Sequence, residues 1–120
     1  MKGTDKTMHE MSIAQGIIDI VRQEMKRYDA SVLKSVRLSV GAMSAVVPEA
    51  LSFCFNVIVS GTELEGAKLI YDAVPLIGLC ELCSRQFEIE NFLFECPYCK
   101  ATKIKTVSGR ELTIVEMEIE

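Results

Sequence analysis

Apolar residues in the first third of the chain recur at the spacing of a helix. From Ser12 the sequence reads SIAQGIIDIVRQEM, with polar side chains between most of the apolar ones. This period predicts an amphipathic helix. The S-x-x-Q pattern of Ser12 and Gln15 is that of a capping box and places the start near Ser12, and we expect the end near Tyr28 and Asp29. The predicted buried stripe comprises Ile13, Ala14, Ile17, Ile18, Val21 and Met25.

Strand period follows the first helix. Apolar and polar side chains alternate through residues 36–40, and Gly41 closes the run, which predicts a strand. After a short loop, Pro48 is well placed at the first position of a second helix that Gly61 ends. Its apolar stripe comprises Leu51, Cys54, Phe55 and Ile58.

Two more strands complete the pattern. Alternation predicts one strand over residues 67–74 and another from Glu111 to the end of the sequence. In the last strand the alternation changes phase at Val115, and a β-bulge would absorb that change. We expect the last strand to pair with the earlier two and the helices to cover the sheet. The predicted class is α+β: a small antiparallel or mixed three-stranded sheet with two helices, plus an inserted module.

The chain divides into three predicted parts. Residues 8–75 and 110–120 form the α+β domain, and residues 76–109, where short apolar pieces separate two cysteine pairs, form the inserted module. Residues 1–7 have no periodicity, so they are predicted to be a disordered N-terminal extension or a tag.

The strongest chemical signal is the spacing C-x2-C-x12-C-x2-C in the inserted module. Two facing turns of this kind place four thiolates at the corners of a tetrahedron, the arrangement that Zn(II) adopts with sulfur ligands. Four bound sulfurs leave no position open for water, so the predicted site is structural, and the module resembles a zinc ribbon with one short hairpin through residues 87–94. A redox CxxC pair and two surface disulfides remain alternatives. The predicted ligands are Cys80, Cys83, Cys96 and Cys99.

Charge and composition exclude several classes of function. The formal net charge of -4 argues against nucleic-acid binding, which needs a basic face. Four thiolates and one dication would make the inserted module about two units negative, because its other charges balance. No apolar run is long enough to cross a bilayer and no signal peptide is visible, so we expect a cytoplasmic protein without a membrane partner. A reducing cytosol also favours metal ligation over disulfides.

Two further residues have uncertain roles on sequence grounds. Cys54 is expected to be a buried thiol that packs as a small hydrophobe rather than a reactive group. His9 is the only histidine, and a lone histidine is more often a surface or capping group than a metal ligand. It lies in a Met8-His9-Glu10 segment that the pattern places just ahead of the first helix.

Nearly all of the chain from Met8 to Glu120 resembles the HypA/HybF family of hydrogenase maturation factors. The motifs that carry the resemblance are MHEMSIAQGIIDIV, VRLSVGAMSAVVPEALSFCF, the pairs CELC and CPYC, and the acidic strand ELTIVEMEIE. The resemblance implies that the His9 imidazole binds transferable Ni(II) together with backbone nitrogens of Met8 and Glu10. It also implies delivery to a [NiFe] hydrogenase large-subunit precursor with a HypB-type maturation GTPase, urease being a further candidate recipient. The oligomeric state is left open between monomer and homodimer.

Three functional hypotheses follow. The first is a nickel metallochaperone with a structural zinc. The second is a zinc-ribbon protein-interaction adaptor without nickel transfer, and the third is a thiol oxidoreductase. An enzyme is not expected, since the chain lacks a P-loop pattern and a recognisable nucleophile motif beside His9.

The residues before Met8 depart from the family pattern. Relatives usually begin at the methionine of this motif, so their α-amino group can serve as a nickel ligand. In this chain seven residues precede it, and the Met8 amide nitrogen would have to substitute. The resemblance therefore leaves the nickel ligand set open at this point.

Overall fold

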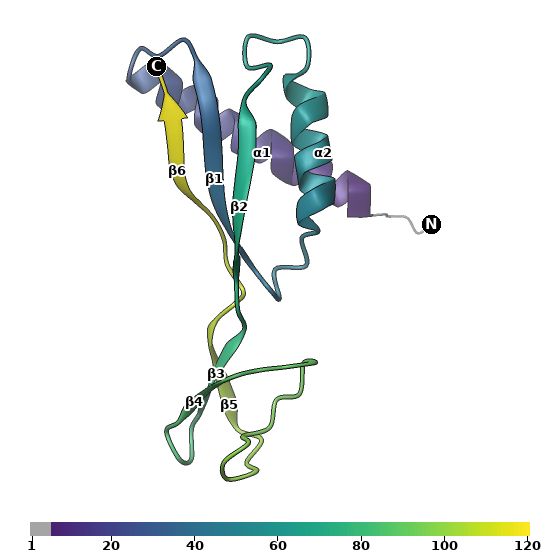
Figure 1. The fold of residues 1–120 in the computed structure, drawn as a ribbon, viewed down its shortest axis with the longest axis vertical. Helices are drawn as coiled ribbons and strands as arrows, with labels where there is room; N and C mark the ends of the chain where they lie inside the picture. The colour runs from purple at the N-terminus through teal and green to yellow at the C-terminus, as the bar shows by residue number, and fades with distance from the viewer. Residues whose placement is uncertain (1–5) are drawn as a thin grey trace. The chain divides into compact units, whose positions relative to one another are not determined.

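The computed structural model describes the backbone of residues 6–120 and the side chains from His9 onward. This part of the chain contains two helices and six strands, whose arrangement can be followed in Figure 1. They divide into two compact units: residues 1–39, 46–72 and 113–120, and residues 40–45 and 73–112. We call these the helical unit and the cysteine unit. No helix within residues 6–120 is long and apolar enough to cross a membrane.

In the helical unit, α1 (Lys6–Arg27) packs against α2 (Pro48–Val59), and α1 crosses one face of a three-stranded sheet (Figure 1). The sheet is formed by β1 (Leu33–Gly41), β2 (Lys68–Val74) and β6 (Leu112–Ile119), in the order β2-β1-β6. Apolar side chains of both helices and of the central strand supply the core. The most buried are Ala14, Ile18, Val21, Val36, Leu38, Leu51, Cys54, Phe55 and Leu64.

The start of α1 differs from the sequence prediction. The helix begins at Lys6, well before Ser12, and Ser12 is an exposed residue in its interior. The capping-box pattern alone did not decide the start, because no proline or glycine interrupts the chain between Lys6 and Ser12. Residues 1–5 of the predicted disordered extension lie outside the described residues. Lys6 and Thr7 form the start of α1, and the assignment of residues 1–7 to an extension or a tag stays a prediction.

The end of α1 is confirmed near Tyr28 and Asp29. Asp29 adopts a left-handed conformation, with φ 55°, and the N–H of Ala30 donates to the carbonyl of Met25 at 2.8 Å. These are the features of a Schellman-type termination. Lys26 and Arg27 in the last turn offset the negative end of the helix dipole.

The second helix begins as predicted, with Pro48 in its first turn. Its N-cap is Val47, which has no side chain able to cap the helix. The helix ends at Val59, just ahead of Gly61, whose φ is 78°. Cys54 is buried.

The sheet pairing corrects one expectation. β6 pairs with β1 alone, because β1 is the central strand and separates β6 from β2. The pairing is antiparallel, since Glu120 and Val32 exchange both of their backbone hydrogen bonds, at 2.8 and 2.9 Å. The change of phase in β6 is confirmed: Ile114 and Met117 are both half-buried, while Val115 is 51% exposed.

The cysteine unit contains β3 (Ile77–Cys80), β4 (Gln86–Glu88) and β5 (Ile104–Ser108), which form an antiparallel sheet in the order β4-β3-β5. The predicted hairpin through residues 87–94 is wrong. β4 pairs back onto β3, with Gly78 opposite Phe87. Asn91 and Phe92, with φ of 55° and 57°, then turn the chain into an irregular segment.

The predicted nickel domain (8–75 and 110–120) and zinc domain (76–109) remain predictions as functional assignments. The cysteine unit also includes the β1–α2 loop, because backbone hydrogen bonds join that loop to residues at both ends of the 73–112 segment. The N–H groups of Gly41, Ala42 and Met43 donate to Glu111, Val74 and Gly109 at 2.7–3.0 Å.

Two glycines allow this close backbone packing. A Cβ at Gly41 would overlap the backbone carbonyl group of Gly109, and Gly109 itself has a φ of 106°.

We predict that Gly41→Ala lowers the free energy of unfolding by about 2 kcal/mol or more, because neither backbone can give way. Thermal unfolding of the purified protein measures this. Gly16→Ala is the matched control: a Cβ there has nothing within 4 Å, and alanine favours the helix. Equal midpoints for the two variants would contradict the packing account.

Candidate metal centres

The two CxxC pairs form matching turns. The carbonyl of Cys80 accepts from the N–H of Ser84 at 2.8 Å, and the carbonyl of Cys96 accepts from Lys100 at 2.9 Å. Ser84 and Lys100, each four residues after the first cysteine of its pair, have φ of 67° and 68°. The two turns therefore repeat one local conformation, and each directs both of its thiols to the same side.

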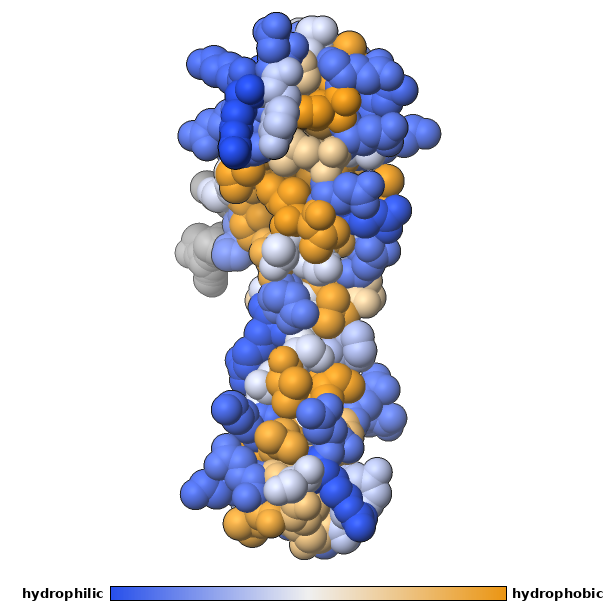
Figure 2. Space-filling view, turned by 90° about the vertical axis from the view of Figure 1, so that its left-hand side faces the viewer, coloured by the Kyte–Doolittle hydropathy of each residue, from blue (hydrophilic) through white to orange (hydrophobic). Residues whose placement is uncertain are grey.

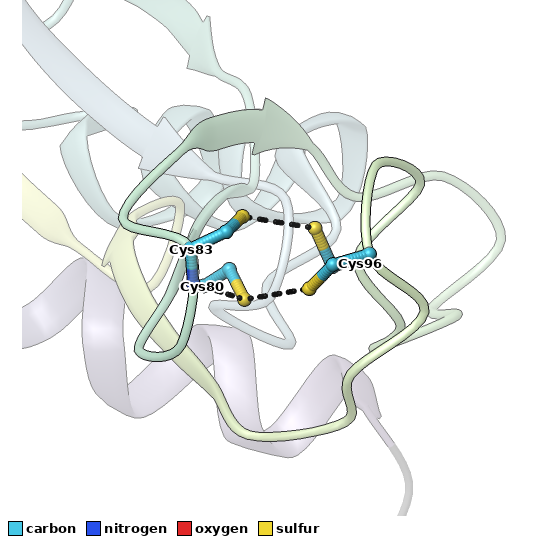
Figure 3. Close-up of side chains that lie close together, drawn as sticks. Cys80, Cys83 and Cys96 are labelled. Atoms are coloured by element: carbon cyan, nitrogen blue, oxygen red, sulfur yellow. Dashed lines mark hydrogen bonds between the residues drawn. The ribbon is translucent and has the colours of Figure 1, made fainter.

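The thiols of the two turns converge. The Sγ atoms of Cys80 and Cys99 lie 3.6 Å apart, as do those of Cys83 and Cys96, and all four lie within 4.8 Å of one another. Figure 3 shows Cys80 and Cys83 facing Cys96 across the space between the turns. A tetrahedron with Zn–S bonds of about 2.3 Å has edges of about 3.8 Å. The cluster therefore has the size that Zn(II) requires, and no disulfide joins these cysteines.

Two of the sulfur atoms accept hydrogen bonds from backbone N–H groups, which favour the thiolate form that binds a metal ion. The N–H of Cys83 points at Cys80 Sγ, and the N–H of Tyr98 points at Cys96 Sγ, each at 3.4 Å. The Cys83 N–H, with further help from Leu82, lowers the pKa of the Cys80 thiol to about 6 despite burial.

Without a cation the four sulfurs cannot all be ionised together. The N–H of Ala101 acts to lower the pKa of Cys99, but the neighbouring thiol of Cys80 and burial outweigh it and raise that pKa to about 12. A bound dication would offset the repulsion between the four thiolates, so metal binding would displace the protons that remain on the thiols. The site is closed by four sulfurs, so it fits a structural rather than a catalytic ion.

His9 lies apart from any such cluster. It is exposed on α1, and the cysteines are the one group of three or more potential ligand side chains that the described residues bring together. The expectation that Met8-His9-Glu10 precedes the first helix is wrong, since all three residues lie within α1.

Glu10 has a structural role that the sequence pattern did not reveal. Its side chain is fully buried, and Oε2 accepts a hydrogen bond from the N–H of Val47 at 2.9 Å. Oε1 has no hydrogen-bond partner among the described residues. Glu10 thus supplies, from α1, an acceptor for the backbone N–H of the N-cap residue of α2, the donor that a capping-box carboxylate satisfies in other helices.

Comparison with known proteins identifies the family. The family described as "Hydrogenase/urease nickel incorporation, metallochaperone, hypA" matches residues 8–119. The chain is 38% identical over 113 residues to the hydrogenase maturation factor HypA of Methylocella silvestris, covering 94% of this chain and all of the relative. It is 42% identical over 115 residues to that of Streptomyces avermitilis, covering 94% of this chain and 88% of the relative. The chain belongs to the HypA family.

Solved structures agree on the fold. The nickel metallochaperone HypA of Helicobacter pylori has a TM-score of 0.63 at 18% identity, with 92% of this chain and 96% of that one covered. A second HypA solution structure has a TM-score of 0.72 at 20% identity, with 98% of each covered. The α+β class with a four-cysteine module, predicted from sequence, is confirmed. The family is one of maturation factors rather than catalysts.

The cysteine cluster generates a prediction about metal removal. The cysteine unit has strands of three to five residues and few buried side chains, so metal binding, on the order of 10 kcal/mol, should supply most of its folding free energy. We expect a strong chelator, or Cys96→Ser, to collapse the dispersed amide signals of residues 76–109 in an NMR spectrum while those of α1 persist. Cys54→Ser is the control, because it changes a cysteine outside the cluster. Retained dispersion without metal would contradict the prediction.

The buried carboxylate generates a second prediction. Glu10→Ala removes the acceptor for the Val47 N–H and should lower the free energy of unfolding by about 1–3 kcal/mol. Glu10→Gln keeps a carbonyl oxygen of similar reach, so its loss should be smaller. Urea unfolding followed by circular dichroism measures both, and a larger loss for glutamine than for alanine would contradict the capping role.

Proposed function

We propose that this chain is a nickel metallochaperone that delivers Ni(II) during maturation of a [NiFe] hydrogenase and carries a structural Zn(II). His9 supplies the imidazole ligand, with backbone nitrogens of Met8 and Glu10. Cys80, Cys83, Cys96 and Cys99 hold the zinc. The match to a family of nickel incorporation over residues 8–119 supports this proposal most directly.

The donor chemistry supports two separate metal roles. Four thiolates in a closed tetrahedron suit Zn(II), whereas imidazole and deprotonated amide nitrogens favour square-planar Ni(II). His9 is exposed, whereas Cys80 and Cys96 of the cysteine cluster are buried. An exposed site with one side-chain ligand exchanges its ion faster than a closed sulfur site, as a delivery protein requires.

The helical state of the nickel segment adds a condition to the proposal. The first four N–H groups of a helix have no partner within it, so the Met8 amide in the first turn of α1 is available. The Glu10 amide is not, because in a helix it donates to the carbonyl of Lys6. Coordination by the Glu10 nitrogen therefore requires the first turn of α1 to open.

The partners follow from the proposed role. The recipient is the hydrogenase large-subunit precursor, and the energy-coupled step belongs to a HypB-type GTPase, because the chain carries no nucleotide-binding loop. Urease is a second candidate recipient. Such a protein works in the cytoplasm and catalyses no reaction itself, and we propose a monomer or homodimer.

A second function has one observation in its favour. Leu82 and Tyr98, the residues at the tips of the two CxxC turns, are 69% and 57% exposed. Exposed apolar tips of this kind suit a zinc-ribbon adaptor that binds proteins without carrying nickel. In that case His9 has no role.

Replacing the histidine separates the two functions. We expect His9→Ala to weaken Ni(II) binding by at least about 100-fold, more than the loss of an outer-shell group typically causes, with one zinc retained per chain. Titration calorimetry and metal analysis measure this. Ser12→Ala, an exposed change on the same helix, is the control. Unchanged nickel uptake in His9→Ala would leave the adaptor as the function.

The extension before Met8 generates a second prediction. A chain that begins at Met8 offers an α-amino nitrogen as a nickel ligand, whereas the present chain must deprotonate an amide and open a helical turn. We expect the shorter chain to bind Ni(II) more tightly, and nickel to reduce the helical circular dichroism of the longer chain only. Equal affinities for the two chains would contradict this ligand set.

A further inference from the structure

Strand β6 is an edge of the helical unit's sheet, and no described segment pairs with its outer side. Glu120 exchanges both backbone hydrogen bonds with Val32 of the chain leading into β1. Because alternate residues of a strand direct their backbone groups to opposite sides, the N–H and C=O groups of Ile119 and Met117 point to the open edge. An exposed edge of this kind is a template for one more strand.

An apolar face and a cleft adjoin that edge. Figure 2, which looks onto the side where β6 lies, shows apolar side chains gathered in the middle of the helical unit. Ile20 of α1 and Val115 of β6 are 48% and 51% exposed. Between the end of α1 and β6 lies a cleft of about 490 Å³, lined by Glu24, Tyr28, Ala30, Met117, Ile119 and Glu120.

The cleft is lined by apolar, aromatic and acidic side chains. Met117, Ile119 and the Tyr28 ring would contact an aliphatic stem, while the carboxylates of Glu24 and Glu120 would lie near its end. The shape and charge fit a lysine or arginine side chain, which buries its stem and keeps its cation solvated. Two of the lining residues already contact a cation of this chain: the Arg27 guanidinium lies 5.6 Å from the Tyr28 ring centre and 3.7 Å from a Glu24 carboxylate oxygen. This exposed contact is weak, so an incoming cation can displace it.

The charge along β6 selects the kind of partner. Residues 111–120 contain Glu111, Glu116, Glu118 and Glu120 and no lysine or arginine. Two cations lie against these carboxylates: Lys34 contacts Glu120 at 2.9 Å, and Arg37 contacts Asp72 at 2.9 Å and Glu116 at 3.9 Å. Because these two cations face five carboxylates, Asp72 included, the edge keeps a net negative charge. A second copy of the same strand would place like charges opposite one another, which is unfavourable.

We infer that β6 is a docking edge for an extended basic segment of a partner protein, which adds as a strand and places a lysine or arginine side chain in the cleft beside Tyr28. The backbone of β6 supplies affinity without regard to sequence, and the cleft and the glutamates select alternating apolar and basic residues. The inference does not depend on nickel binding. It adds to the proposed function a place where a client or an assembly partner is held.

The probe is a synthetic heptapeptide of alternating lysine and valine, with the glutamate-valine peptide as its charge control. Titration into the zinc-loaded full chain, followed by amide NMR shifts, should move the signals of Met117 and Ile119 with the lysine peptide only. Glu24→Gln combined with Glu120→Gln should weaken binding by about tenfold, because each exposed charge pair contributes only a factor of a few.

Backbone pairing is tested by Met117→Pro, which removes an N–H from the open edge and leaves the bonds to β1 in place. Met117→Ala removes the same side chain and keeps that N–H, so it is the matched control. If the proline variant loses its fold, a lysine peptide N-methylated at alternate residues tests the same hydrogen bonds on the unaltered protein. Loss of binding with Met117→Pro or the N-methylated peptide, and retention with Met117→Ala, support the inference.

Three results would overturn the inference: no binding of the lysine peptide, equal binding of the glutamate peptide, or shifts confined to residues outside β6 and the cleft. Self-association through the same edge would also overturn it. Light scattering across a concentration series would then show a dimer that Met117→Pro dissolves.

Discussion

The convergence of four sulfur atoms is the constraint on which the cysteine unit depends. Its strands are short, and the side chains that it buries, such as Leu76 and Ile89, are too few to hold it without a cross-link. The two CxxC turns adopt the same conformation, and their N–H groups point at sulfur. A dication completes this arrangement, because it relieves the repulsion that otherwise raises the pKa of Cys99.

A closed sulfur site also decides where a second metal can bind. Zinc bound to all four sulfurs would leave no position of the tetrahedron open, so the transferable ion of the proposed function must use other donors. The burial of Glu10 fixes the orientation of His9, the imidazole donor that we propose. Successive residues of a helix point about 100° apart, so anchoring Glu10 to Val47 turns the preceding His9 outward to solvent. One residue thus stabilises the helix pair and exposes its neighbour.

Much of this arrangement could be predicted from the sequence. Regular periods identified both helices and the β1, β2 and β6 strands, and the doubled CxxC spacing identified the cysteine cluster, because each signal is local. The start of α1 was missed, since the capping pattern at Ser12 competes with a segment that contains no helix breaker. The hairpin predicted through Leu93 and Phe94 was wrong, because the turn after Cys80 returns the chain to β3 instead. The contact of Glu10 with Val47 joins residues distant in sequence, and no local pattern could predict it.

The central claim is that two donor sets keep two metals apart. X-ray absorption at the zinc and nickel edges of one doubly loaded sample tests it directly. The account predicts zinc surrounded by four sulfurs at about 2.3 Å and nickel surrounded by nitrogen and oxygen alone. Sulfur in the first coordination shell of nickel would contradict it.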